Sequence, residues 1–580
     1  MTSGGPCSMS SLLANGKPGR NSPPNLLRWI APAVVTALFL AFAAGSFAYY
    51  AQHAFINADS WAVYDMARSF DEHFYQGVLI RQFHLNLDYG ASYAFLGPIL
   101  VYATEALTGL GAYSHYLISA LAGLGALLLG GVILGKAAGE RRSPAVTLAT
   151  LLLAVTAFNV WEFYRDIYRA STIPIALFFI LAAVAQFPRC GGLSAGRAAL
   201  IGVTMGLAAM TRFDVNLLVA AFTMVILVTA GAHRFRAAAG YVGGVLLTIS
   251  PWILFSLLVF GRVYASDNAI VAIAVKQLLS LDLIPPGEPT LFVDFSGWFA
   301  RVSATGADFL RILEAMLARS PFAWLFLAAV PALALGLAIW GRAGRERKPA
   351  TAGGAADGMM DEPLRYPLTL TLVAAAGLLL FIGPVATGYQ INTRYYSMTF
   401  LLCALALIGW MLAGMTAAER RLGRRGPRLA LEAVVTCLCL AGFPTMLREA
   451  FEQGWPPLHF NEANRFAEAH PTLMRCVPAD GRTLLLFRYT SQTLQDGIRF
   501  GVLARRTVLI MPNNWPDVST GRKLAFLRDA RVSHVWLDEA ESRDGLVVPE
   551  MVMEPMAGCP GFYRLAPPPG QATAGSPFPN

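Results

Sequence analysis

The sequence predicts a polytopic α-helical membrane protein with about eleven transmembrane helices, followed by a small C-terminal α/β domain outside the cytoplasm. Of the 580 residues, 55% are hydrophobic and only 14% are charged, and the mean hydropathy is +0.50. A soluble domain carries about a quarter charged residues, so this composition excludes an ordinary soluble protein. The net charge of +9 is spread over short basic clusters between apolar runs. This pattern is typical of cytoplasmic loops and does not indicate a nucleic-acid partner.

The start of the chain predicts its orientation in the membrane. Residues 1–25 are rich in Ser, Gly, Pro and Asn, and we expect them to form a disordered cytoplasmic tail. Lys17, Arg20 and Arg28 have no acidic neighbour, which places the N-terminus inside. The apolar run at 29–50 is long enough to span a bilayer and too long for the core of a signal peptide. It therefore carries the chain outward.

We expect the transmembrane domain to cover residues 26–448, with a first external loop at 51–114. Within this loop, residues 93–107 are apolar but short for a span and contain Gly97-Pro98, which predicts an interfacial or re-entrant helix. The next span is predicted at 116–135. A polar break at Thr211–Asp214 divides the long apolar run 202–228 into a hairpin. A single alternation of the spans across the membrane then places every basic cluster on the cytoplasmic side. These clusters lie at 139–142, 189–197, 234–236, 342–348 and 420–428.

Residues 449–570 are predicted to form the extracytoplasmic α/β domain, and residues 571–580 a disordered tail. Buried strands are expected at 482–487, 507–511 and 532–537, alternating with helices at 461–469, 492–503 and 521–530. This alternation predicts a small parallel sheet, to which residues 562–565 add an edge strand. Cys476 and Cys559 both lie in this region. If it is extracytoplasmic, they are candidates for a disulfide.

Ionisable residues at the external mouths of spans are the candidates for chemistry, because charge at membrane depth is costly. Asp59 follows the first span within a segment that also contains Asp65 and Arg68. The other candidates lie on the same face in the alternation of spans above: His84, Arg165 and Asp166, Arg212 with Asp214, and Arg394 with Tyr395.

Each candidate also has a structural explanation. Asp59 or Asp65 could solvate a surface helix, and Arg165 could form an ion pair with Asp166. Arg212 could pair with Asp214 to stabilise the hairpin turn, and Arg394 could anchor its span at the lipid headgroups. No single one of these residues identifies a site. The prediction of a functional site rests on their all being placed on the external face.

The pattern resembles the GT-C glycosyltransferases, in particular the branch with protein O-mannosyltransferases and the lipid A aminoarabinose transferase. The resemblance covers about residues 26–414. It rests on Asn57-Ala-Asp59-Ser, the short helix at 93–107, Tyr164-Arg165-Asp166, Gly206-Leu-Ala-Ala-Met-Thr211-Arg212 and Arg394-Tyr395. The chain departs from the family at Ser60, where the family has Glu, and at 90–93, where Gly-Ala-Ser-Tyr replaces Pro-Pro.

The resemblance implies an inverting transfer of a sugar from a polyprenyl-phosphate donor to a cell-envelope acceptor outside the cytoplasmic (inner) membrane. Asp59 would then be the catalytic base, with Asp166 as a second catalytic carboxylate. The substrate-binding residues implied are Arg165, Arg212, Arg394, Tyr395 and His84. The two carboxylates are also the ligands for a divalent cation, Mg²⁺ or Mn²⁺, if one is used.

Two other functions stay open at this point. A transporter or flippase of a lipid-linked envelope precursor would have ionisable residues at mid-membrane and broken helices in matching halves, and neither is apparent in the sequence. A non-catalytic protein that anchors its C-terminal domain in the membrane would tolerate substitution of Asp59, Asp166 and Arg394.

Overall fold

The computed structural model describes part of the transmembrane domain and part of the C-terminal domain. The described residues are 63, 64, 67, 94–111, 113–137, 172–187, 193–212, 215–230, 233–260, 368–374, 397–422, 475–478, 483–486, 508–510, 519–529, 532–537 and 552–566. The predicted tails at 1–25 and 571–580, the first span and the helices at 461–469 and 492–503 lie outside them.

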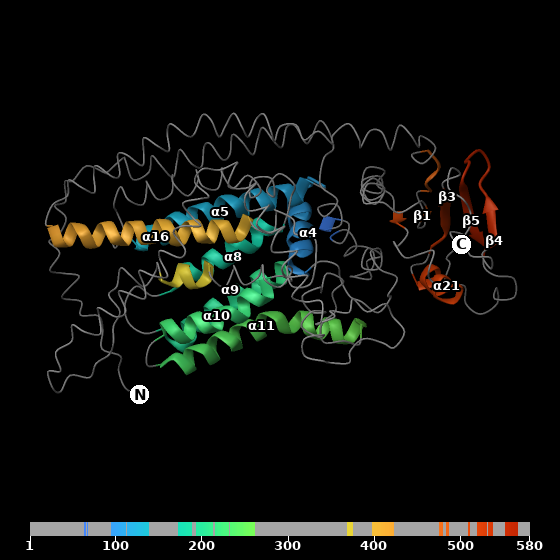
Figure 1. Cartoon of the computed structure of the whole chain (residues 1–580). Helices are drawn as coiled ribbons and strands as arrows, with labels where there is room; N and C mark the ends of the chain where they lie inside the picture. Colours follow the sequence, from blue (N-terminus) through green and yellow to red (C-terminus); the bar gives the residue numbers. More distant parts are fainter. Residues whose placement is uncertain are drawn as a thin grey trace, which may run out of the picture.

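A short helix is present where an interfacial or re-entrant one was predicted. Helix α4 (Leu96–Thr108) has 13 residues, or about 20 Å at 1.5 Å per residue, which is less than the ~30 Å of a bilayer core. In Figure 1 it lies across the ends of the longer helices rather than along them. The helix ends at Gly109, which has a left-handed φ of 67° and whose N–H donates to the carbonyl of Glu105 at 2.7 Å.

Two helices in the described part of the chain are long and apolar enough to cross a membrane. One is α5 (Tyr113–Ala137), which contains the span predicted at 116–135, and the other is α11 (Arg234–Phe260). Their most apolar windows have mean hydropathies of 2.4 and 1.5. The predicted total of about eleven spans extends over residues that the structure does not describe, so this number stays a prediction.

Helix α8 (Ile173–Ala185) lies at the centre of the described helices and runs parallel to α5. Nine of its 13 residues are buried, and Phe178 packs against Gly125 of α5. At the far end of both helices, Lys136 Nζ donates a hydrogen bond to the carbonyl of Ala185. Pro174 occupies the first turn of α8, where its missing N–H leaves no helical bond unmade.

The predicted break in the apolar run 202–228 is confirmed. Helix α9 (Ala195–Thr211) ends at Arg212, whose backbone is extended (φ −149°, ψ 131°), and α10 (Val215–Thr229) begins three residues later. The chain returns through α11, which packs against α9 and donates a hydrogen bond from Tyr241 Oη to the carbonyl of Val219 on α10 at 2.8 Å.

Helices α9 and α11 approach each other closely because glycine faces backbone across their interface. A Cβ at Gly202 would overlap the carbonyl of Tyr241, and one at Gly244 would overlap the carbonyl of Ala199. Gly240 lies against Ala195 in the same way. This is the small-residue packing by which transmembrane helices associate.

Helix α11 contains Pro251, which cannot donate a backbone hydrogen bond to the carbonyl of Leu247. Ser250 Oγ donates to that carbonyl at 3.0 Å instead, so the carbonyl that proline leaves without its helical partner is satisfied locally. The next residue, Trp252, is 1% exposed and packs its ring against Phe95, with centroids 5.5 Å apart. Proline thus coincides with the point where α11 meets the N-terminal side of α4.

Helix α16 (Ser397–Leu422) packs against α5 and α8. Its Trp410 Nε1 donates to Thr371 Oγ1, at 2.8 Å, in the helical residues 368–374. Cys403 is buried in α16 and is a free thiol. This agrees with a packing role for the cysteines of the apolar runs.

The C-terminal domain contains a five-stranded sheet with the order β2-β1-β3-β5-β4. Three strands were predicted and are parallel: β1 (Thr483–Leu486), β2 (Val508–Ile510) and β3 (His534–Leu537). Helix α21 (Thr520–Asp529) confirms the helix predicted at 521–530 and connects β2 to β3.

The strand predicted at 562–565 is present, but its predicted place at the edge of the sheet was wrong. Strand β5 (Phe562–Ala566) lies inside the sheet, antiparallel to β3, and β4 (Val552–Pro555) forms the edge. The sheet is therefore mixed rather than parallel. β4 was missed because its sequence, VMEP, is short and contains proline and glutamate, which are depleted in strands. Its position is fixed by the turn to β5, where Gly558 and Gly561 have positive φ.

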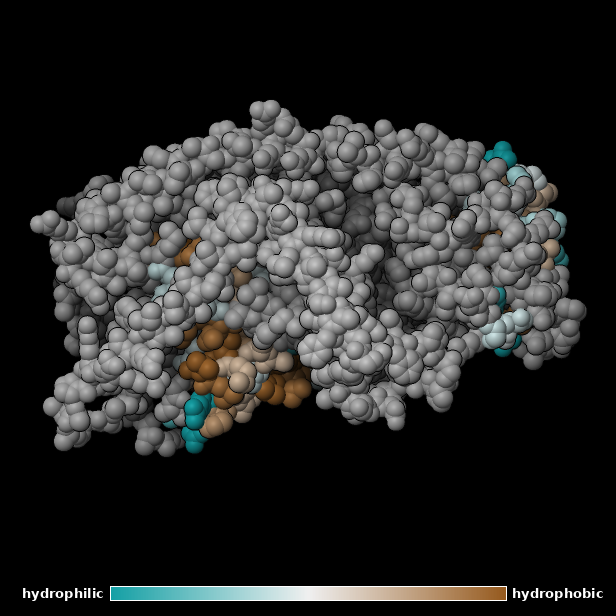
Figure 2. All heavy atoms as spheres, in the orientation of Figure 1, coloured by the Kyte–Doolittle hydropathy of each residue, from teal (hydrophilic) through white to brown (hydrophobic). Residues whose placement is uncertain are grey.

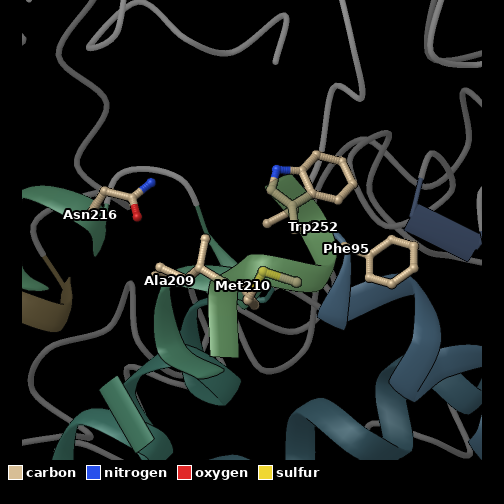
Figure 3. Close-up of a pocket in the computed structure, with 7 residues that line it drawn as sticks. Phe95, Ala209, Met210, Asn216 and Trp252 are labelled. Atoms are coloured by element: carbon tan, nitrogen blue, oxygen red, sulfur yellow. The ribbon is translucent and has the colours of Figure 1, made fainter. Parts of the chain in front are cut away.

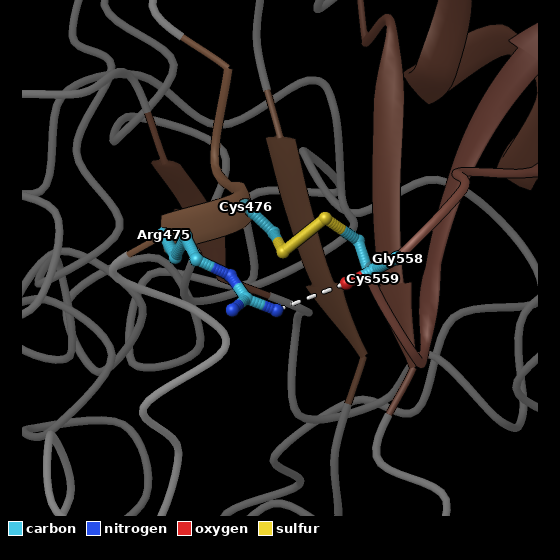
Figure 4. The surroundings of a disulfide bond; sticks show 4 residues. All are labelled: Arg475, Cys476, Gly558 and Cys559. Atoms are coloured by element: carbon cyan, nitrogen blue, oxygen red, sulfur yellow. Dashed lines mark hydrogen bonds between the residues drawn. A yellow bond between two sulfur atoms is a disulfide. The ribbon is translucent and has the colours of Figure 1, made fainter.

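The disulfide between Cys476 and Cys559 is present, as the sequence suggested for an extracytoplasmic domain. The two Cα atoms are 5.8 Å apart, and the bond joins the segment before β1 to the turn between β4 and β5. Arg475 Nη2 donates to the carbonyl of Gly558 beside it, at 3.1 Å (Figure 4). In Figure 1 the sheet lies beyond the end of the helices at which α4 is found.

Large apolar side chains are exposed on the outer surface of α10 and α11, where Figure 2 shows them as one brown area. Leu247 and Leu258 are 70% and 77% exposed. The other members are Met224, Val228, Phe235, Leu246, Leu254 and Leu257. Soluble proteins rarely expose so continuous an apolar surface, whereas a surface in contact with lipid requires one.

Candidate functional site

The ends of several helices meet beside α4, and we call this the α4 end of the bundle. Thr172 immediately precedes α8 and lies at the centre of this meeting point. A Cβ on Gly97 of α4 would be only 3.1 Å from Thr172 Cγ2, and Arg212 Nη1 donates to Thr172 Oγ1 at 3.4 Å. The start of α4, the start of α8 and the end of α9 are therefore neighbours.

Arg212 is the predicted site residue that the structure describes. Its N–H caps α9 by donating to the carbonyl of Ala208 at 3.2 Å, and its side chain is partly buried. The guanidinium lies beside the first turn of α8, where the backbone N–H groups carry the positive end of the helix dipole. This combination favours an anion close to Arg212.

A small hollow of about 10 Å³, which has room for about one water molecule, lies at the α4 end. Figure 3 shows Phe95 and Trp252 together on one side of it, with Asn216 on the other. Its lining residues are Ala94, Phe95, Ala209, Met210, Asn216, Ile249 and Trp252. The wall is almost entirely apolar, and Asn216 is its one amide.

The segment that follows Asp59 is held against the other end of α4. Val63, Tyr64 and Ala67 are helical and at most 6% exposed. Tyr64 Oη donates to Glu105 Oε1 at 2.8 Å across 41 residues of sequence. Thus α4 contacts the segment after Asp59 through Glu105 and the neighbourhood of Arg212 through Gly97.

The opposite end of the same helices carries the basic residues, and we call it the basic end. Lys136 on α5 contacts the end of α8, and Arg197 Nε on α9 donates to the carbonyl of Gln186, just after α8, at 2.6 Å. The start of α11 lies against the start of α9, which brings Arg234 and Arg236 to this end. Parts of two predicted inner clusters, those at 189–197 and 234–236, are therefore gathered at one end together with Lys136.

The remaining predicted site residues lie outside the described part of the chain: Asp59, His84, Arg165, Asp166, Arg394 and Tyr395. The structure describes what flanks them. Thr172 follows Asp166 by six residues and Ala94 follows His84 by ten, and both lie at the α4 end. Asp65 and Asp214 also lie outside, so the solvating role considered for Asp65 and the ion pair considered for Arg212 stay predictions.

The proposed cation ligands Asp59 and Asp166 are both among those undescribed residues. The described ranges contain no group of three or more His, Cys, Asp or Glu side chains placed to hold a metal ion. The requirement for Mg²⁺ or Mn²⁺ therefore stays a prediction.

Sequence reasoning missed Thr172, Tyr64 and Glu105 as neighbours of the candidate site. Thr172 carries a signal, because a hydroxyl directly before Ile173-Pro174 marks the start of a helix. Glu105 carries a second signal, since it is the only acidic residue in the apolar stretch of α4. The pairing of Glu105 with Tyr64 has no sequence signal, because it depends on how two segments pack.

Neither a scan against known protein families nor a search of curated proteins finds a match. Among solved structures, the chain is similar to the crystal structure of ArnT from Cupriavidus metallidurans bound to undecaprenyl phosphate. The TM-score is 0.49 at 12% identity, over 91% of this chain and 97% of that one. The apo form of the same protein gives a TM-score of 0.47 at 12% identity, over 92% and 98%.

The archaeal oligosaccharyltransferase AglB from Archaeoglobus fulgidus, in complex with an inhibitory peptide and a dolichol-phosphate, gives a TM-score of 0.46 at 13% identity. It matches over 83% of this chain and 65% of that one. Both proteins belong to the GT-C superfamily that the sequence motifs resemble.

Proposed function

We propose that this protein is a membrane-embedded inverting glycosyltransferase that moves a sugar from a polyprenyl-phosphate donor to an acceptor on the extracytoplasmic face of the cytoplasmic membrane. The observation that carries the proposal is the meeting of separate stretches at the α4 end. Tyr64, Ala94, Thr172 and Arg212 follow or belong to four of the predicted site segments, and contacts through α4 and α8 connect all four.

The distribution of charge supports the orientation that this proposal requires. Basic residues mark the cytoplasmic side of membrane proteins, and Lys136, Arg197, Arg234 and Arg236 are gathered at the basic end. The α4 end then faces outward. The disulfide of the C-terminal domain agrees with this direction, because disulfides persist in oxidising compartments and the sheet lies beyond the α4 end (Figure 1).

The arrangement around Arg212 fits a donor that has an isoprenoid chain and a phosphate. An isoprenoid requires an apolar surface, and the side chains of Phe95, Met210 and Trp252 around the hollow are apolar. A phosphate requires cations, and Arg212 beside the start of α8 provides one. The exposed apolar surface of α10 and α11 would face the lipid in which such a donor is dissolved.

In the proposed reaction, the acceptor hydroxyl attacks the anomeric carbon of the donor from the face opposite the phosphate. A bond forms between the acceptor oxygen and that carbon as the bond from carbon to phosphate oxygen breaks, and the configuration inverts. Asp59 removes the hydroxyl proton. Arg212, together with Arg165 and Arg394, stabilises the negative charge that develops on the departing polyprenyl phosphate.

The test uses purified protein in liposomes with a total lipid extract and a polyprenyl-phosphate donor whose sugar is radiolabelled. We expect the label to leave the donor with the wild-type protein and to stay on it with Asp59→Asn. Asp65→Asn, six residues away in the same segment, is the matched control and should keep activity. Turnover by Asp59→Asn at the wild-type rate would reject the assignment.

The same assay separates transfer from transport of a lipid-linked precursor. A glycosyltransferase changes the chemical species that carries the label, whereas a flippase moves the intact donor between leaflets. Movement of intact donor without transfer of its sugar would favour the transporter. Comparison of lipid extracts from wild-type and deletion strains by mass spectrometry would then identify the acceptor or the accumulated donor.

A further inference from the structure

We propose that the hydrogen bond from Tyr64 to Glu105 positions the segment that carries Asp59, so that Glu105 and Tyr64 are positioning residues for the transfer reaction. The inference rests on the proposed function, because it assigns these two residues a role through Asp59. Tyr64 Oη donates to Glu105 Oε1 at 2.8 Å, and the two residues are 41 positions apart.

The contact is well suited to fix one placement of the segment. Val63 and Ala67 pack beside Tyr64 and are at most 1% exposed, but apolar contacts are not directional and allow sliding. A hydrogen bond from a phenol to a carboxyl group has a defined geometry and is stronger when the acceptor is charged. Tyr64 is only 6% exposed, so water competes poorly for its hydroxyl.

Helix α4, which carries the hydrogen-bond acceptor of Tyr64, makes contacts at both of its ends. The carbonyl of Glu105 accepts from Gly109 at the end of α4, and a Cβ on Gly111 would lie 3.5 Å from Tyr64 Oη. The start of α4 lies against Thr172. Eight residues of helix separate Gly97 from Glu105, which is about 12 Å. Helix α4 therefore sets the spacing between the Tyr64 contact and the Arg212 neighbourhood.

The short stretch of chain between Asp59, the proposed base, and Val63 links the position of Asp59 to the Tyr64 contact. Residue 59 precedes Val63 by four residues, and four residues reach at most about 14 Å. A fixed point at Val63 and Tyr64 thus limits how far from it Asp59 can lie. A loss of this fixed point would leave Asp59 chemically intact but misplaced, and a displacement of about 1 Å can lower a rate by about 100-fold.

The test compares Tyr64→Phe, which loses the donor, Glu105→Ala, which loses the acceptor, and Glu105→Gln, which keeps an acceptor oxygen. Thr104→Ala is the matched control, because its hydroxyl bonds only within α4, to the carbonyl of Leu100. In the liposome assay, we expect Tyr64→Phe and Glu105→Ala to lower kcat by about 10- to 100-fold, with the KM for donor changed less than about twofold. Glu105→Gln and Thr104→Ala should stay near wild type.

Two further measurements separate positioning from folding. Thermal unfolding should change little in all four variants, and the double variant Tyr64→Phe/Glu105→Ala should lose no more activity than the worse single variant, since both remove one interaction. Hydrogen exchange of the peptide 59–70 should rise in Tyr64→Phe and Glu105→Ala only. Unchanged kcat in both variants, or additive losses in the double variant, would overturn the proposal.

The hydrogen-exchange result does not depend on the reaction. If wild-type protein transfers no sugar but exchange at 59–70 rises in the two variants, the contact stands as a fixed point of the segment and the proposed function fails. If transfer is observed and exchange does not change, the proposed function stands and the positioning role fails.

Discussion

At the scale of single residues, Arg212 connects the end of α9 to the start of α8. Its backbone ends α9, and its guanidinium contacts Thr172 at the start of α8. The placement of a permanent positive charge beside the start of a helix is the arrangement expected of a phosphate-binding residue.

Substitution of Arg212 should therefore reduce transfer more than it reduces stability. We expect Arg212→Gln to lower kcat/KM for the lipid-linked donor by about 100-fold, in the range found when one charge-stabilising donor is removed. Arg212→Lys keeps the positive charge but not the planar guanidinium group, so its kcat/KM should fall less than that of Arg212→Gln. Arg197→Gln, at the basic end, is the control and should transfer sugar normally. Equal losses for Arg212→Gln and Arg197→Gln would contradict the assignment.

His534 supplies a prediction about pH in the C-terminal sheet. Partial burial, together with the charge of its cross-strand partner Arg564, lowers the pKa of His534 below its ordinary value. The unfolded chain therefore binds this proton more readily than the folded one. The stability that this difference provides is complete above the unfolded pKa of about 6.5 and is lost as the pH falls through the folded pKa.

The pKa of His534 can be measured by exchange of the imidazole C2 hydrogen with mass spectrometry. We expect it to lie below that of an exposed histidine and to rise in Arg564→Gln without reaching the ordinary value, because burial remains. His534→Gln should remove this part of the acid sensitivity of the sheet. A pKa that Arg564→Gln leaves unchanged would show that the charge of Arg564 does not contribute.

At the scale of elements, the α9–α11 interface sets the position of Arg212 and of the hollow at the α4 end. Gly202 of α9 and Gly240 and Gly244 of α11 each face backbone atoms of the other helix, so the two backbones approach there without intervening side chains. Gly243 and Gly244 provide a matched pair within α11. Gly244 is buried against the carbonyl of Ala199, while Gly243 is exposed with nothing within 4 Å of its Cβ position.

We expect Gly244→Ala to destabilise the protein by about 1–3 kcal/mol, because the added methyl group forces the helices apart. Gly243→Ala should be neutral or slightly stabilising, since alanine favours helix by about 1 kcal/mol over glycine. Thermal unfolding in detergent, followed by size-exclusion chromatography, measures both. An equal effect of the two substitutions would contradict the close packing of α9 and α11.

The elements differ in how far the sequence could predict them. The break at Arg212 was predictable because a polar turn interrupts an apolar run, and β1, β2 and β3 were predictable as short apolar runs. Strand β4 was not, since two of its four residues, Glu554 and Pro555, are depleted in strands and its pairing with β5 is tertiary. The contact between Tyr64 and Glu105 depends on tertiary packing across 41 residues, for which neither periodicity nor spacing gives a signal.

At the scale of the whole molecule, the disulfide in the C-terminal domain tests whether this domain lies in an oxidising compartment outside the cytoplasm. Reduction of the Cys476–Cys559 disulfide, or replacement of both residues by alanine, should cost about 2–5 kcal/mol of stability in the sheet. Limited proteolysis with and without reductant measures this cost. Reductant should have no effect on the double variant, and a wild-type protein whose two cysteines alkylate without prior reduction would contradict an oxidising location.

The two ends of the helices make the orientation of the protein testable at described, exposed positions. Thr108 ends α4, and His233 precedes α11 at the basic end. If the α4 end faces outward, Thr108→Cys should react with a membrane-impermeant maleimide in intact cells, whereas His233→Cys should react only after permeabilisation. Both are introduced into a variant whose free cysteines are replaced and whose disulfide is kept, so that each new thiol is the only reactive one.

The reverse labelling pattern would place the basic end outside and would separate Arg212 from any donor phosphate on the outer surface. It would also contradict the disulfide, because the C-terminal sheet lies on the side of the α4 end (Figure 1). Charge distribution and disulfide chemistry are independent physical constraints, and they predict the same orientation. Labelling at Thr108 from outside therefore tests the premise shared by the catalytic role of Asp59, the phosphate contact of Arg212 and the positioning role of Tyr64.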